Sequence, residues 1–163
     1  MKAVILAGGL GSRIAEETYD KPKPMVPIGG LPILWHIMKI YSHYGIHEFV
    51  VCLGYKGYVI KDFFHHFYLH TNHVTYDLGN DEITYHDRVR EPWKVTLVDT
   101  GQDVMTGARL KKVAPYIDEE PFLMTYGDGV GDVPIDKLVQ FHKDHGKIAT
   151  RYGGESARAL WSH

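Results

Sequence analysis

The sequence predicts an α/β fold in which a mostly parallel sheet lies between two layers of helices. Short apolar runs typical of buried strands alternate along the chain with segments whose apolar residues recur at helical spacing. Three of the apolar runs lead directly into glycine-containing loops. The chain has 163 residues, of which 44% are hydrophobic and 23% charged, and this suits one globular domain with a buried core.

Four of the predicted strands belong to the sheet. They are rich in the aliphatic and aromatic residues that favour strands, and they span residues 2–6, 47–53, 95–98 and 122–126. Two further strands, 74–78 and 83–86, are joined through Gly79-Asn80, which favours a β-hairpin. This hairpin interrupts the alternation of strands and helices, so we expect it to be an insertion.

Four helices are predicted between and after these strands. Their apolar residues recur at helical spacing over residues 34–41, 59–67, 106–113 and 136–145. Gly45 marks the end of the first helix, and Gly57 precedes the second. The aromatic residues of the first two helices are expected to fill the core rather than to stack on a base; they are Trp35, Phe63, Phe64 and Phe67.

A glycine-rich loop, Ala7–Arg13, follows the first strand, and the run Lys21-Pro22-Lys23-Pro24-Met25 comes soon after it. Such a loop brings backbone N–H groups close to a bound anion, because no Cβ stands in the way. Arg13, Lys21 and Lys23 add positive charge, and the two prolines stiffen the segment that presents Lys23. We therefore predict a site for a nucleoside triphosphate, with a plain tight turn as the alternative.

Two better-known phosphate-binding motifs do not match this loop. The dinucleotide fingerprint fails because Ile14 stands where its third glycine should follow Gly9 and Gly11. The Walker A pattern fails because no Gly-Lys-Ser/Thr follows the loop. A nicotinamide-dependent oxidoreductase is also disfavoured, since it needs a ribose-binding acid where Cys52-Leu53-Gly54 ends the second strand.

Asp128 stands between Gly127 and Gly129 at the end of the last predicted strand. The glycine loop, Thr100-Gly101 and this segment all follow strands, so a parallel sheet brings them to one edge. A carboxylate there is suited to hold Mg²⁺ against phosphate oxygens, the alternative being an aspartate that closes a turn.

The two cations named above would then act on the phosphates. Arg13 would neutralise the β- and γ-phosphates. Lys23 would stabilise the charge that develops on the α-phosphate during in-line attack. In such a reaction the protein positions and neutralises, so no nucleophilic side chain is needed. The alternative for Arg13 is a surface ion pair with Glu16 or Glu17.

Composition excludes several other classes of function. The net charge of −2 gives no basic surface for nucleic acid or a membrane, and no apolar run reaches membrane-spanning length. The single cysteine, Cys52, allows no internal disulfide, and the strand that begins at Lys2 leaves no room for a cleavable signal, so a cytoplasmic protein is expected. His66 and His70 have metal-ligand spacing, but no H-E-x-x-H pattern accompanies them, and solvated or packed histidines are favoured.

Residues 1–150 resemble the N-terminal part of the sugar-nucleotide nucleotidyltransferase family. The family signature is the glycine loop with Arg13 followed by Lys-Pro-Lys-Pro-Met with Lys23. Further matching stretches are 29–38, 54–61, 91–101, 105–107 and 125–130. The resemblance implies a Rossmann-like three-layer α/β/α fold of the nucleotide-diphospho-sugar transferase type.

The resemblance also implies an activity, namely transfer of a cytidylyl group from CTP to glucose 1-phosphate. The products are CDP-glucose and pyrophosphate, Mg²⁺ is the cofactor, and the product serves nucleotide-sugar and lipopolysaccharide O-antigen biosynthesis. Arg13 and Lys23 would be catalytic, and Asp128 would bind the metal ion. The nucleotide would be held by Leu6, Ala7, Gly8, Gly9, Leu10, Gly11, Ser12, Arg13, Lys23, Thr106, Gly107, Arg109 and Gly127. Ala108 stands where the family usually has glycine, and its methyl group bears on how closely the loop approaches the ligand.

Residues 151–163 resemble nothing in the family. Codons can be chosen for them so that an offset of one nucleotide reads ATAVKAPGRFGA, which resembles the family's continuation. We therefore expect a frameshift to have replaced the later part of the chain, which sequencing of the encoding DNA tests. A sheet without its later strands leaves an apolar edge that favours a homo-oligomer. A catalytically inactive nucleotide-binding fragment is accordingly the alternative function.

Overall fold

The structure is a computed structural model that describes the chain except residues 10–19, 87–89, 119–120 and 154–163. The chain divides into two compact units, Met1–Gly129 and Val130–His163. The first unit holds the sheet. The described residues of the second unit include the helix α5 (Ile135–His145), which ends at Gly146 in the left-handed conformation with φ of 61°. The predicted helix over 136–145 is thus confirmed.

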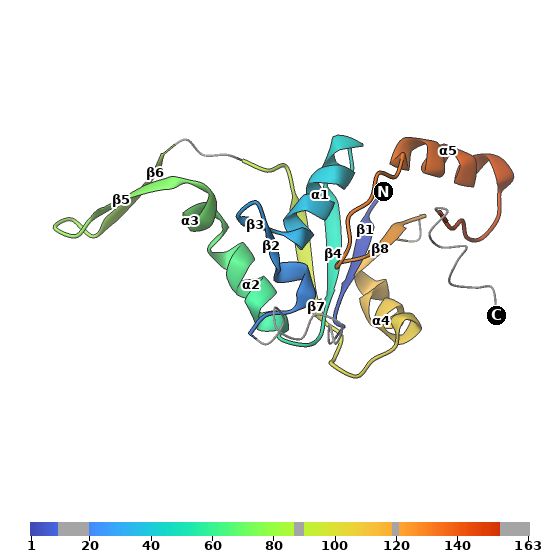
Figure 1. The fold of residues 1–163 in the computed structure, drawn as a ribbon, viewed down its shortest axis with the longest axis horizontal. Helices are drawn as coiled ribbons and strands as arrows, with labels where there is room; N and C mark the ends of the chain where they lie inside the picture. The colour runs from blue at the N-terminus through green and yellow to red at the C-terminus, as the bar shows by residue number, and fades with distance from the viewer. Residues whose placement is uncertain (10–19, 87–89, 119–120, 154–163) are drawn as a thin grey trace. The chain divides into compact units, whose positions relative to one another are not determined.

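A four-stranded parallel sheet forms the centre of the first unit (Figure 1). Its spatial order is β7 (Lys94–Asp99), β4 (Glu48–Leu53), β1 (Ala3–Ala7) and β8 (Leu123–Tyr126). All three pairings are parallel. Leu53 pairs with both Ala7 and Asp99, so the carboxyl ends of these strands are level. The predicted convergence of the following loops on one edge is confirmed.

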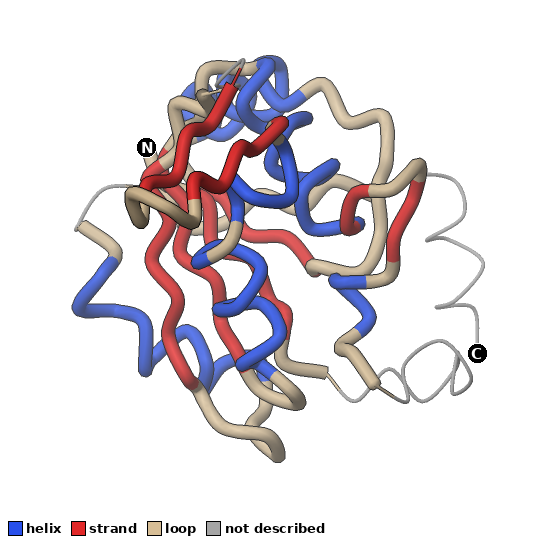
Figure 2. Tube along the Cα trace, turned by 90° about the vertical axis from the view of Figure 1, so that its left-hand side faces the viewer, coloured by secondary structure: helices blue, strands red, loops and turns tan. Residues whose placement is uncertain are grey.

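Helices pack against both faces of this sheet, and Figure 2 shows helices (blue) beside its strands (red). On one face, alternate residues of β1 and β4 pack against α1 (Ile33–His43), α2 (Gly57–His65) and α3 (Phe67–Thr71). On the other face, the remaining residues pack against Val113 of α4 (Thr106–Val113). Because both faces of β1 are buried, its sequence is apolar throughout. The three-layer fold is confirmed.

The second predicted helix differs from expectation, because it breaks at His66 into α2 and α3. After the break, Phe67 lies 5.8 Å from Phe63 and 6.1 Å from Trp93, measured between ring centroids. The four aromatic residues named in the prediction do contribute to the core, either buried in it or packed against it; they are Trp35, Phe63, Phe64 and Phe67.

The inserted hairpin is confirmed, with shifted ends. It consists of β5 (His73–Asp77) and β6 (Glu82–His86), which pair with each other and not with the central sheet. The first strand ends at Asp77 because this carboxylate accepts hydrogen bonds from the N–H groups of Gly79 and Asn80, which turns the chain there.

Four short elements were not predicted. They are two 3₁₀ helices, η2 (Lys23–Met25) and η3 (Ala114–Tyr116), and two antiparallel strands, β2 (Pro27–Ile28) and β3 (Leu31–Pro32). Each is two or three residues long, which is too short to produce a recognisable hydrophobic period.

Candidate functional site

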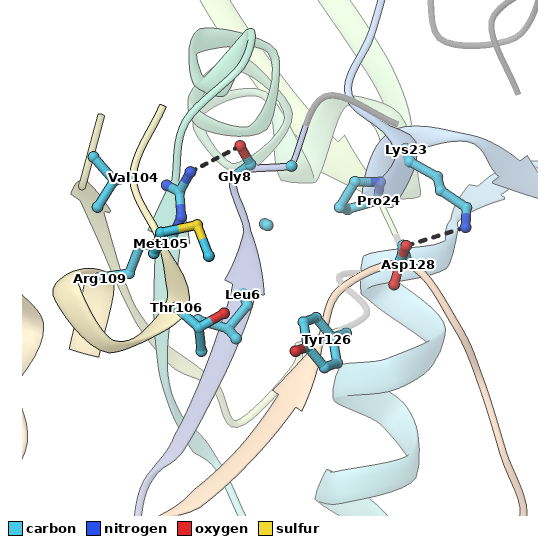
Figure 3. Close-up of a pocket in the computed structure, with 12 residues that line it drawn as sticks. Leu6, Gly8, Lys23, Pro24, Val104, Met105, Thr106, Arg109, Tyr126 and Asp128 are labelled. Atoms are coloured by element: carbon cyan, nitrogen blue, oxygen red, sulfur yellow. Dashed lines mark hydrogen bonds and ion pairs between the residues drawn. The ribbon is translucent and has the colours of Figure 1, made fainter. Parts of the chain in front are cut away.

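A cavity of about 210 Å³ opens within the first unit, beside the carboxyl end of β1 (Figure 3). Its lining comes from β1 and the loop after it, from η2, from the start of α4 and from the end of β8. The lining residues are Leu6, Ala7, Gly8, Gly9, Lys23, Pro24, Val104, Met105, Thr106, Arg109, Tyr126 and Asp128. Eight of these were predicted as site residues, so the structure brings together segments more than a hundred residues apart in sequence.

Lys23 and Asp128 form an ion pair on one side of this cavity (Figure 3). The Nζ atom of Lys23 donates to Oδ2 of Asp128 at 3.0 Å, and the two side chains are 24% and 45% exposed. Lys23 begins η2, whose next two residues, Pro24 and Met25, are buried and anchor the turn. The stiff Lys-Pro-Lys-Pro run thus presents an accessible cation, as predicted from its prolines.

Gly127 allows the end of β8 to approach the end of β1. Its N–H donates to the carbonyl of Leu6 at 2.9 Å. A Cβ at this position would lie 3.2 Å from that carbonyl oxygen and from Cγ of Pro24, so a larger residue would fit only if these neighbours shifted. Gly127 itself does not line the cavity.

Arg109 stands on the other side of Gly8 and is only 6% exposed (Figure 3). Its Nη1 donates to the carbonyls of Leu53 at 3.1 Å and Gly101 at 2.7 Å, and to Oγ1 of Thr100 at 2.6 Å. Its Nη2 donates to the carbonyls of Gly8 at 3.1 Å and Gln102 at 2.9 Å. One guanidinium thus joins the loops that follow β1, β4 and β7.

The close approach of these loops requires glycine at two positions. A Cβ on Gly8 would overlap Nη1 and Cζ of Arg109. A Cβ on Gly54 would lie 2.5 Å from the carbonyl oxygen of Gly8 and 2.9 Å from Nη1 of Arg109. Gly54 therefore helps to support the glycine loop, although the sequence analysis assigned it no role at the site.

The first turn of α4 contributes Thr106 to the cavity. No side chain caps this end of the helix, so its N–H groups and the positive end of its dipole are open to an anion. Gly107 follows in the same turn, does not line the cavity, and has open space where a Cβ would be. Ala108 is exposed, so its methyl group displaces no packed neighbour.

Sequence reasoning missed four lining residues, namely Pro24, Val104, Met105 and Tyr126. Pro24, Met105 and Tyr126 are direct chain neighbours of predicted site residues, and Val104 lies two positions before Thr106; this nearness is the one signal that could have found them. Met105 is 83% exposed, a high value for a large apolar side chain. Four other predicted residues, Leu10, Gly11, Ser12 and Arg13, lie outside the described part of the chain.

The described residues contain no group of three or more histidine, cysteine, aspartate or glutamate side chains arranged to hold a metal ion. Asp128 nevertheless suits Mg²⁺, which is commonly bound by one or two carboxylates together with phosphate oxygens and water. Its carboxylate faces the cavity and already attracts one cation, the ammonium of Lys23. His66 is paired instead with Asp62, its Nδ1 lying 3.2 Å from Oδ1.

Cys52 lies beneath the site and does not line the cavity. Burial raises the pKa of its thiol to about 11, an effect partly offset by the positive charge of Arg109. At neutral pH the thiol is protonated and buried between β1 and α4, which makes it a packing residue, as predicted.

Comparison with known proteins shows what this site belongs to. The family model described as nucleotidyl transferase matches residues 2–159. The chain belongs to the nucleotidyl transferase family. The glucose-1-phosphate cytidylyltransferase of Salmonella typhimurium is 60% identical to it over 151 residues, which are 92% of this chain and 59% of that protein. The chain therefore spans about three fifths of this curated relative.

Solved structures give the same fold for this nucleotidyl transferase. HddC from Yersinia pseudotuberculosis, complexed with GMP-PN, is 27% identical with a TM-score of 0.62, over 88% of this chain and 54% of HddC. UDP-glucose pyrophosphorylase complexed with UDP-glucose has a TM-score of 0.64 at 18% identity, over 89% of this chain and 54% of that one. In the described part of the chain, no helix combines the length and the apolar character needed to cross a membrane.

Proposed function

We propose that this chain forms the nucleotide-binding part of an enzyme that transfers a cytidylyl group from CTP to glucose 1-phosphate. The observation that carries the proposal is the cavity that Ala7, Gly8 and Gly9, the described residues of the glycine loop, line together with the Lys23–Asp128 ion pair. Loop amides, an ammonium group and a carboxylate suit a triphosphate and its metal ion. The choice of CTP and glucose 1-phosphate rests on the 60% identity with the Salmonella enzyme.

The reaction is an in-line displacement at the α-phosphate of CTP. An oxygen of the sugar phosphate forms a bond to this phosphorus, and the bond to the bridging oxygen of the β-phosphate breaks. Pyrophosphate leaves with that electron pair, and CDP-glucose remains. The protein has to align the two reactants and neutralise the charge, because both the nucleophile and the leaving group are supplied by the substrates.

Each proposed role belongs to a residue already placed at the cavity or predicted beside it. Lys23 leaves Asp128 when CTP binds and stabilises charge on the α-phosphate. The backbone of the glycine loop holds the β- and γ-phosphates, with Arg13 assigned to the same phosphates by resemblance. Asp128 would hold Mg²⁺, which supplies charge neutralisation on the phosphate oxygens.

Calorimetry and a pyrophosphate-release assay test this proposal on the 163-residue chain. With Mg²⁺ present, CTP should bind more tightly than UTP or GTP, and Lys23→Ala should weaken the binding of CTP. The matched control is Lys94→Ala, because Lys94 pairs with Glu48 at the opposite end of the sheet from the cavity. Equal losses in both variants, or no binding of CTP to the unaltered chain, would contradict the proposal.

Nucleotide binding without turnover is the second candidate. It is favoured by one observation, namely that Asp128 is the only carboxylate among the described residues that line the cavity. Many enzymes that act on phosphates stabilise the attacking and leaving oxygens with two metal ions, and one carboxylate offers few ligands for such a pair. Binding of CTP without release of pyrophosphate when glucose 1-phosphate is added would select this candidate.

A further inference from the structure

We infer that the β5–β6 hairpin binds the hairpin of a second copy of this chain, with the two β6 strands side by side and antiparallel. The contact forms one four-stranded sheet from two hairpins, centred on Thr84 of each copy. The hairpin extends from α3 away from the central sheet (Figure 1), and none of its residues lines the cavity. The inference therefore goes beyond the proposed function and does not rest on it.

The side chains of the hairpin separate into an apolar face and a polar face. Successive residues of a strand alternate between faces, and residues that pair across two strands share a face. Tyr76 and Ile83, a cross-strand pair of the apolar face, are 53% and 55% exposed. The apolar face carries Val74, Tyr76, Ile83 and Tyr85, and the polar face carries His73, Thr75, Asp77, Glu82, Thr84 and His86.

The outer edge of β6 is open to another strand. In the part of the chain that the structure describes, β6 pairs with β5 and with no third strand. Edge strands are commonly protected by lysine, proline or a β-bulge. β6 contains neither residue, and its register with β5 is unbroken over five pairs. A two-stranded hairpin is marginally stable alone, whereas three or more strands with an apolar face can be stable, so added strands would stabilise this one.

The sequence of β6 is complementary to itself when two copies run antiparallel. With the two Thr84 residues opposite each other, Ile83 of one copy lies opposite Tyr85 of the other, and Glu82 lies opposite His86. A β-branched residue beside an aromatic ring, a carboxylate beside an imidazole and two facing threonines are favourable cross-strand pairs. The two-fold symmetry forms each unlike pair twice. The apolar side chains of both hairpins then lie on one face of the shared sheet.

β5 has a similar pattern of residues, but its polar side chains are already engaged within the hairpin. The carboxylate of Asp77 accepts hydrogen bonds from the backbone N–H and from Nδ2 of Asn80. Oγ1 of Thr75 is bonded to Nε2 of His86 at 2.8 Å. Pairing of β5 with its own copy would have to compete with these bonds.

The polar side chains of β6 are available for a partner. No hydrogen bond to another described residue engages the carboxylate of Glu82 or the hydroxyl of Thr84, and both residues are exposed. When Nε2 of His86 accepts the proton of Thr75, the ring carries its own hydrogen on Nδ1. This N–H can be donated to Glu82 of the second copy. These differences between the strands assign the contact to β6.

Cysteine cross-linking tests the two-fold axis at Thr84. Directly opposite residues of an antiparallel pair have Cα atoms about 4.5 or 5.5 Å apart, a separation that a disulfide bond can span. Oxidised glutathione should therefore join Thr84→Cys chains into disulfide-linked dimers, which a non-reducing gel detects. The native Cys52 is buried and should not react.

Thr75→Cys is the matched control. Thr75 is also exposed, and it lies on the polar face at the centre of β5, directly opposite Thr84 of the same chain. In the shared sheet it is separated from its own copy by three strand spacings of about 4.8 Å each, which is too far for a disulfide. Thr84→Cys should therefore cross-link about tenfold faster or more. Equal rates, faster cross-linking of Thr75→Cys, or no dimer in either variant would overturn the inference.

Hydrogen exchange followed by NMR tests the contact on the unaltered chain. Raising the protein concentration should slow the exchange of alternate amides in β6, because these N–H groups point away from β5 and bond to the second copy. The amides on the outer edge of β5 should exchange at an unchanged rate. A concentration effect in β5 instead of β6, or in neither strand up to millimolar concentration, would overturn the inference.

Discussion

Lys23 forms an ion pair with Asp128, the carboxylate at which a divalent metal ion is expected to bind. Its ammonium lies 3.0 Å from Oδ2 of Asp128, so a metal ion that binds there must approach a nearby positive charge. When a triphosphate is present, the same ammonium has phosphate oxygens to bind instead. Lys23 thus weakens the binding of the metal ion alone by charge repulsion, and it strengthens the binding of the nucleotide through its phosphates.

A variant without this ammonium should therefore change two affinities in opposite directions. In Lys23→Ala, we expect Mg²⁺ or Mn²⁺ alone to bind Asp128 more tightly, because repulsion is removed, and Mg²⁺–CTP to bind more weakly. Titration with Mn²⁺ followed by electron paramagnetic resonance measures the first affinity, and calorimetry measures the second. Asp128→Asn is the reference for loss of the metal ion, and a fall in both affinities in Lys23→Ala would contradict the competition.

The contact between Gly8 and Arg109 predicts a coupling between two substitutions. Gly8→Ala places a methyl group against the guanidinium and should lower the free energy of unfolding by about 1–3 kcal/mol, as overpacking does. In an Arg109→Ala background the same methyl group has room, so its cost should fall by about 1 kcal/mol or more. Urea denaturation of the four proteins in the cycle measures this coupling. Additive effects would show that the overlap is relieved by a shift of the loop.

The elements whose patterns are local were predictable from sequence. The predicted strand at residues 47–53 and the predicted helix at 106–113 agree with β4 and α4 within one residue. Burial on both faces makes the strand a continuous apolar run, and burial on one side gives the helix apolar residues at helical spacing. Lys23 and Asp128 were identified from their immediate neighbours in sequence. Prolines stiffen the segment that presents Lys23, and glycines flank Asp128 at the end of a strand. The break at His66 was not predictable, since Phe67 packs on Trp93, far along the chain.

The hydrogen-bond partners of Arg109 could not be predicted from the sequence. The arginine was assigned to the nucleotide because its neighbours matched a family motif, but its hydrogen bonds go to four carbonyls in three other segments of the chain. Backbone carbonyls carry no residue-specific signal, so no pattern marks them as acceptors. The glycines at positions 8 and 54 were visible, but the guanidinium that requires them was not.

The turn of the β5–β6 hairpin depends on one ionised side chain. Hydrogen bonds from the side chain of Asn80, and then from the N–H groups of Asn80 and Gly79, hold the pKa of Asp77 below its usual value. A lowered pKa means that the ionised form is stabilised in the folded turn. This contribution is present above the ordinary aspartate pKa of about 4 and is lost as the pH falls through the lower value in the turn.

Acidification should therefore loosen this turn before it affects the sheet. Between pH 5 and pH 2, the amides of Gly79 and Asn80 should lose their shifted NMR positions and exchange faster. The variant Asp77→Asn should show no such pH dependence at these amides. Asp81→Asn is the control, because Asp81 lies in the same turn with φ of 54°, which asparagine tolerates, and this variant should keep the wild-type response. An unchanged response in Asp77→Asn would assign the titration to another group.

At the scale of the whole molecule, the sheet has an apolar border at β8. Met124 and Tyr126 pair with Val4 and Leu6 and continue the sheet face that α4 covers, yet they are 44% and 61% exposed. Within the described residues, β8 is an edge strand, paired with β1 on one side only. An edge with unpaired backbone groups and apolar side chains favours pairing with another chain.

We therefore expect this chain to self-associate through β8. Met124→Lys places a charge on the exposed border without entering the cavity, because Met124 is not among its lining residues. The dissociation constant of the oligomer should rise about tenfold or more, which sedimentation velocity over a range of concentrations measures. Tyr58→Lys is the control, since Tyr58 is 66% exposed on α2, on the opposite face of the sheet. If Tyr58→Lys dissociates the oligomer and Met124→Lys does not, the chains associate through the face that carries α2, and the prediction of association through β8 is wrong.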